Sequence, residues 1–94
     1  MEHVIEINDK SGREIGLTER QWKHIRHKHL DVNELMIEET FVNPLNIIIE
    51  DEGVAIYYRY FKDKDSNPYL KVMVKYLNGD GYVITSYFVK GMLK

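Results

Sequence analysis

The chain has 94 residues, no cysteine and a formal net charge of −2. This length fits one domain, and the lack of cysteine excludes a disulfide framework and a thiolate zinc site. The nearly balanced charge argues against a strongly basic protein that binds duplexes without specificity. No apolar run approaches the roughly 18 residues that a membrane helix needs, and the acidic, alternating N-terminus is not a signal peptide. We therefore expect a cytoplasmic protein without membrane contact.

Charge is unevenly distributed along the chain. Residues 20–29 hold four basic side chains and no acidic one, whereas residues 31–52 hold seven acids and no lysine or arginine. Residues 53–94 are basic again, with seven basic and three acidic side chains. Two interpretations stay open: ordinary solvated charge, or a basic helix and a basic C-terminal half that share one face.

The first elements predicted are a hairpin and a helix. Residues 3–17 alternate and contain Ser11-Gly12, which predicts a hairpin turned at this pair. Thr18 and Gln21 then form a capping box, in which Thr18 accepts from the backbone and Gln21 reaches back. The helix that follows has one face marked by the recurrence of Trp22, Ile25 and His29. We expect Trp22 to anchor this helix to the sheet.

A second helix is predicted over residues 32–42. Asp31 and Glu34 repeat the capping signature, and Asn43-Pro44 ends the helical pattern.

After this helix the pattern becomes that of strands. Four short segments are β-branched, aromatic or alternating, namely residues 45–50, 54–61, 69–77 and 82–89. Asn-Gly-Asp-Gly at residues 78–81 is a strong hairpin signal. The fold class expected is therefore α+β: a single domain, residues 1–94, with an N-terminal hairpin and two helices packed on a curved four-stranded antiparallel sheet.

Strand alternation predicts which side chains share a face. In residues 69–77 we expect Leu70, Val72 and Val74 to face the helices, and in residues 54–61 the set that contains Ile56 and Tyr58. The opposite face would then carry Arg59, Lys75, Thr85 and Tyr87. The alternative is an ordinary half-polar outer face without a function.

Three of the four histidines, His24, His27 and His29, lie in the first helix. Three interpretations are open: metal ligands, solvated residues of a basic helix, or acid–base and phosphate-contacting groups. The neighbouring Arg26 and Lys28 would repel a metal ion, and a partner carboxylate set is missing. Histidine can transfer protons near neutral pH, which suits the third interpretation.

The order of these motifs resembles that of a known family. Residues 17–30, LTERQWKHIRHKHL, are similar to the opening motif of small phage and prokaryotic proteins assigned to the barnase–EndoU–colicin–RelE-like (BECR) nuclease group. Further similarities follow in order: the proline after the second helix, the pair Tyr58-Arg59, VMVK, and the ITSY segment that ends at Tyr87. Gln21 departs from the pattern, since the family usually has arginine there.

The resemblance implies metal-independent, toxin-like endoribonuclease chemistry without a cofactor. Carried over by position, it implies His24, His29, Arg59, Lys75, Thr85 and Tyr87 as catalytic residues. The expected substrate contacts are Arg26, Lys28 and Tyr57. RNA would be the substrate, cleaved by attack of its 2′-OH to give a 2′,3′-cyclic phosphate, and an antitoxin or immunity protein is a candidate partner. His24 is preferred to His29 as the base because His29 lies toward Trp22. The alternatives are a module that binds nucleic acid or protein without turnover, and a domain with a structural role.

Overall fold

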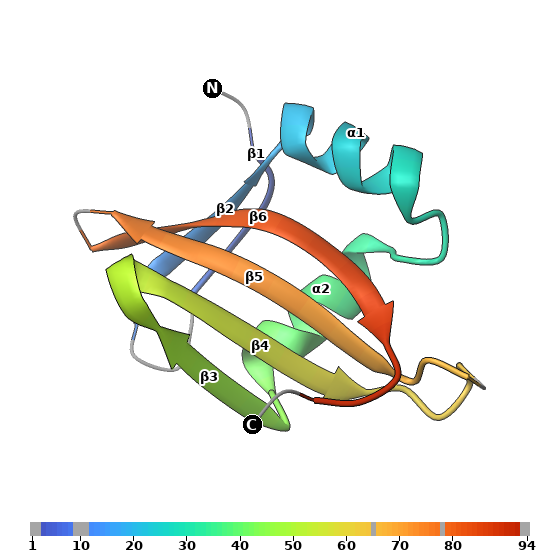
Figure 1. Cartoon of the computed structure of the whole chain (residues 1–94). Coiled ribbons are helices and arrows are strands. Elements are labelled where there is room, and N and C mark those ends of the chain that lie inside the picture. The colour runs from blue at the N-terminus through green and yellow to red at the C-terminus, as the bar shows by residue number, and fades with distance from the viewer. Residues whose placement is uncertain (1–2, 9–11, 65, 78, 93–94) are drawn as a thin grey trace.

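The computed structural model describes residues 3–8, 12–64, 66–77 and 79–92. Within these described residues, six strands, two α-helices and one 3₁₀ turn follow each other (Figure 1). They are β1 (His3–Asn8), β2 (Glu14–Thr18), α1 (Glu19–Lys28), α2 (Glu34–Val42), β3 (Asn46–Glu50), η1 (Asp51–Gly53), β4 (Val54–Tyr60), β5 (Tyr69–Leu77) and β6 (Asp80–Val89).

All six strands belong to one mixed sheet, in the order β1-β2-β6-β5-β4-β3. The expectation of a separate hairpin beside a four-stranded antiparallel sheet is therefore wrong. β1 and β2 do pair antiparallel, but β2 also pairs with β6 in parallel, through Ile15–Gly81 and Gly16–Tyr82. This short parallel contact joins the N-terminal strands to the antiparallel strands β3–β6. Of the predicted turn at Ser11-Gly12, Ser11 lies outside the described residues.

The helices begin at polar caps. Thr18 accepts from the backbone N–H of Gln21 at 3.2 Å, as expected. The Gln21 side chain does not reach back to complete a capping box; it donates to the carbonyl of Ile84 in β6. α2 is capped by Asn33, which accepts from Met36 N at 2.9 Å, and not by Asp31. No helix among the described residues is both long and apolar enough to span a membrane.

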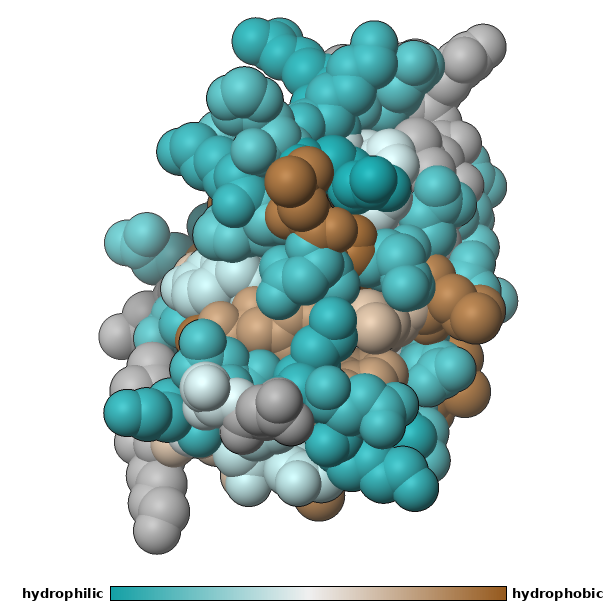
Figure 2. Space-filling model, turned by 90° about the vertical axis from the view of Figure 1, so that its right-hand side faces the viewer, coloured by the Kyte–Doolittle hydropathy of each residue, from teal (hydrophilic) through white to brown (hydrophobic). Residues whose placement is uncertain are grey.

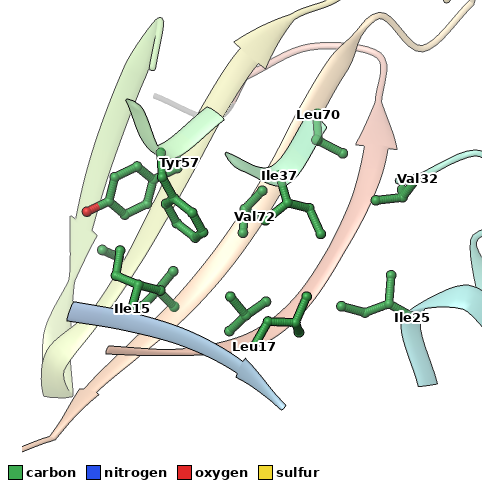
Figure 3. Close-up of a cluster of buried hydrophobic side chains, with 12 residues drawn as sticks. Ile15, Leu17, Ile25, Val32, Ile37, Tyr57, Leu70 and Val72 are labelled. Atoms are coloured by element: carbon green, nitrogen blue, oxygen red, sulfur yellow. The ribbon is translucent and has the colours of Figure 1, made fainter. Parts of the chain in front are cut away.

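The main core lies between one face of the sheet and the two helices (Figure 3). Twelve buried side chains form it among the residues that the structure describes, and Trp22 packs against it while remaining half-buried. These twelve are Ile15, Leu17, Ile25, Val32, Ile37, Phe41, Ala55, Tyr57, Leu70, Val72, Val74 and Val83. The expected position of Trp22 on the core side of α1 is confirmed, although its burial is incomplete.

The connection between α1 and α2 carries the large apolar side chain with the highest exposed fraction among the described residues. Figure 2 views the molecule from the right-hand side of Figure 1 and shows a mostly hydrophilic surface, with hydrophobic side chains between the polar ones. Leu30, which belongs to this connection, is 76% exposed.

Candidate functional site

The face of the sheet opposite the main core is assigned by strand register. Directly paired residues share a face, and β4, β5 and β6 pair through Tyr58–Lys71 and Lys71–Tyr87. Their neighbours Tyr57 and Val72 belong to the main core, so Tyr58, Lys71 and Tyr87 point the other way. We call this side the helix-free face; α2 lies against the opposite side of the sheet (Figure 1).

A change of register in β6 decides which of its residues reach this face. Met73 pairs with Thr85, whereas the next residue, Val74, pairs with Val83. Ile84 is therefore an extra residue, as in a β-bulge. Val83 consequently faces the main core, while Thr85 and Tyr87 both lie on the helix-free face, where alternation placed them.

Three chemically useful groups meet where α1 flanks β6. The imidazole of His29 stacks on the ring of Tyr87, with centroids 5.2 Å apart and planes at 26°. The ammonium of Lys71 lies 5.4 Å from the centroid of the same ring. His29, Lys71 and Tyr87 are all half-buried, so each is partly open to solvent. We call these three residues the His29 site.

The position of His29 follows from how α1 is attached. The hydrogen bond from Gln21 to the carbonyl of Ile84 ties the first turn of α1 to β6. His29 is the C-terminal cap, and its backbone N–H donates to Ile25 O at 2.7 Å. Ile25 is fully buried. A core contact and a cap therefore fix the imidazole beside Tyr87.

Two other predicted residues share the helix-free face at different distances. Thr85 lies two residues before Tyr87 in β6, about 7 Å along the strand, opposite Met73. Lys75 lies four residues after Lys71 in β5, about 13 Å away. Its ammonium donates to the carbonyl of Glu52 in η1. Lys75 is therefore engaged at the far corner of the face and outside the His29 site.

Arg59 is on the wrong face for the predicted cluster. It pairs with Leu70, which belongs to the main core, so the expectation that Arg59 lies beside Lys75 and Tyr87 is wrong. Its guanidinium donates to Asn43 O at 2.8 Å, and its Nε lies 3.7 Å from a carboxylate oxygen of Glu39. Arg59 thus joins the end of β4 to the end of α2.

The remaining predicted residues do not join the site. Tyr57 is a core residue, 3% exposed, with its ring edge-on to Phe41 at 4.9 Å, so its assignment as a substrate contact is wrong. His24 and Lys28 are exposed on α1. Arg26 is also exposed, and its guanidinium lies 5.5 Å from the ring centroid of Trp22. These three belong to the basic surface of α1 that borders the site.

Lys71 is the residue that the sequence prediction missed. Alternation placed it on the same face as Lys75, but nothing in the sequence distinguished the two lysines. The signal that could have distinguished the two lysines is the register of the β5–β6 hairpin, which decides that Lys71 is the one opposite Tyr87.

Metal ligands do not gather in the part of the chain that the structure describes. No group of three or more histidine, aspartate or glutamate residues there could hold a metal ion together. The chemistry available at the His29 site is that of an imidazole, an ammonium and a phenol.

Comparison with protein-family models, curated proteins and solved structures gives no match for this chain.

Proposed function

We propose that the chain is a metal-independent endoribonuclease that acts through the His29 site. The observation that carries the proposal is the stack of His29 on Tyr87 with the ammonium of Lys71 beside the same ring. An imidazole can take a proton, an ammonium can stabilise a developing phosphorane, and a phenol can give a proton to the leaving oxygen. These are the groups that cleavage by an internal 2′-OH requires.

In the proposed reaction His29 removes the proton of the 2′-OH. The 2′-oxygen attacks the adjacent phosphorus, the bond to the 5′-oxygen breaks, and that oxygen takes a proton from the hydroxyl of Tyr87. Exchange with water then returns His29 and Tyr87 to their starting protonation states. The products are a 2′,3′-cyclic phosphate and a 5′-OH. Lys71 stabilises the added negative charge on the phosphate oxygens, and Thr85 donates to the same group from the neighbouring position on β6.

The basic surface of α1 supports RNA as the substrate. Its four basic side chains, Arg20, Lys23, Arg26 and Lys28, are all exposed, and the helix ends at His29. Lys23 forms an ion pair within the helix, with Glu19 at 3.5 Å. An RNA backbone whose phosphates bind along these basic side chains therefore reaches the imidazole of His29. An antitoxin or immunity partner belongs to this proposal as well, since it rests on the same resemblance. A cytoplasmic location, expected from the composition of the sequence, is part of the proposal too.

The test is incubation of the purified chain with a mixed RNA pool in EDTA, followed by mapping of the product ends. We expect 2′,3′-cyclic phosphate and 5′-OH ends. His29→Ala should lower the rate about a hundredfold or more, the usual contribution of a positioned base. His27→Ala is the matched control, because His27 is an exposed histidine of the same helix.

Cleavage that needs a divalent ion, or that leaves 5′-phosphate ends, contradicts the mechanism. Equal losses in the two histidine variants contradict the site. RNA binding that depends on Lys71 without any cleavage favours the alternative function, a binding module that uses the same face.

A further inference from the structure

The edge strand β3 is unusually open and apolar. It is the last strand of the sheet, and its centre is three consecutive isoleucines, residues 47–49. Ile49 is 71% exposed and Ile47 is 37% exposed. Natural edge strands are commonly blocked by lysine, proline or a bulge, and the central residues of β3 have none of these.

The backbone of β3 has a donor that faces away from the sheet. The N–H of Ile47 donates to the side-chain oxygen of Asn46 at 3.0 Å. A side chain that satisfies its neighbour's N–H in this way occupies the position that the carbonyl of an added strand would take.

The apolar surface continues from β3 onto α2. Ile47 and Ile49 pair with Tyr57 and Ala55, so they lie on the same side of the sheet as α2. Ten large apolar side chains are exposed among the described residues, and five of them fall within residues 35–49. These five are Leu35, Val42, Leu45, Ile47 and Ile49. We call them the 35–49 patch.

A depression of about 310 Å³ lies along α2 beside this patch. Its lining consists of Leu35, Glu38, Glu39, Val42, Asn43 and Arg59. Apolar side chains therefore form part of its wall, with two carboxylates beside them. The single arginine is already engaged by Asn43 and Glu39.

The charge around the patch defines the partner. Residues 31–52 contain seven acids and no lysine or arginine. An occupant with positive side chains gains attraction along this segment. A second copy of the chain would bring the same acidic segment against itself across a two-fold axis, which like-charge repulsion opposes.

We infer that β3 and the 35–49 patch form a docking site for an extended partner segment with alternating apolar and basic side chains. The segment adds to the sheet as a strand beside β3. Its apolar side chains cover Ile47 and Ile49 on the α2 side of the sheet. Its basic side chains alternate to the opposite side, where the exposed Glu50 at the end of β3 lies. This site is independent of the proposed function, since it lies at the β3 edge of the sheet, with β4 between it and the strand that carries Lys71.

The test uses a synthetic nine-residue peptide of alternating valine and lysine, titrated into the ¹⁵N-labelled chain and followed by NMR and calorimetry. We expect amide shifts confined to β3 and α2, and binding that weakens as salt is added. Ile49→Lys should weaken binding about tenfold or more. Leu77→Lys is the matched control, since Leu77 is 52% exposed at the end of β5 and outside the patch. Ile47→Pro removes the outward donor and should abolish binding, with thermal melting as the check on its fold.

Three results overturn the inference. One is equal binding of a peptide of alternating valine and glutamate. Another is no binding at millimolar peptide, or shifts located elsewhere. The third is a dimer of the chain in sedimentation that Ile49→Lys dissociates, which would make a second copy the occupant.

Discussion

Tyr57 offers a sharp choice between a core role and a substrate role. Its ring is 3% exposed and edge-on to Phe41, and its hydroxyl lies 2.6 Å from the hydroxyl of Tyr76. Tyr57→Ala deletes a buried aromatic side chain, so we expect it to lower the free energy of unfolding by about 3–5 kcal/mol. Tyr57→Phe keeps the ring and loses one hydrogen bond, which should cost about 1 kcal/mol.

Thermal and urea unfolding measure these losses. For a domain of this size, about 1 kcal/mol corresponds to a fall in Tm of about 4–8 °C. Tyr57→Phe should therefore melt a few degrees lower, and Tyr57→Ala should be largely unfolded near the wild-type Tm. A Tyr57→Ala variant that melts within a few degrees of wild type and yet loses RNA binding would refute the core assignment.

Three further changes test local features by unfolding. Asn33→Ala should lower the free energy of unfolding by about 1 kcal/mol because Asn33 caps α2, whereas Asp31→Ala should leave it almost unchanged. The opposite order of losses would mean that Asp31, and not Asn33, caps the helix. Gly53→Ala should destabilise more than Gly79→Ala, since both have positive φ but only at Gly53 would a Cβ meet a backbone oxygen, at 2.9 Å; equal losses would contradict this contact. Trp22→Ala should cost about 2–3 kcal/mol, less than for a fully buried tryptophan, and a change below about 1 kcal/mol would mean that Trp22 does not anchor α1.

Local sequence signals located most elements correctly. The predicted strands over residues 45–50, 54–61, 69–77 and 82–89 agree with β3–β6 to within two residues at each end. Both helices were found, with α2 beginning two residues later than expected. Such signals depend on residues close in the chain. The parallel contact of β2 with β6 joins residues more than 60 positions apart through only two residue pairs, so no local pattern marks it.

The face assignment failed in β4 for a physical reason. Alternation identifies a core face only where the other face is polar. In β4 four successive residues, 55–58, are buried, so both faces are apolar. Ile56 and Tyr58 are buried on the helix-free face, outside the main core. Because Ile56 and Tyr58 were predicted to face the main core, alternation placed Arg59 on the helix-free face, which is the wrong side.

The candidate site could be predicted only in part. β5 alternates cleanly, so Lys75 and Lys71 were placed on the correct face. His29 was found through its motif, but its stack on Tyr87 depends on how α1 is attached to β6, which the Gln21–Ile84 hydrogen bond determines. The bulge at Ile84 places Val83 on the core side, against simple alternation, whereas Thr85 and Tyr87 lie on the face that alternation predicted.

The most direct test of the account compares RNA cleavage by Lys71→Ala and Arg59→Ala in EDTA. Lys71 lies beside Tyr87, while Arg59 is on the opposite side of the sheet and bonded to α2. We predict that Lys71→Ala lowers the cleavage rate about a hundredfold, the usual effect of removing a donor to the transition state. Arg59→Ala should keep its rate within a few-fold of wild type wherever the variant is folded. Loss of cleavage in folded Arg59→Ala, with Lys71→Ala fully active, would contradict the placement of the site on the helix-free face.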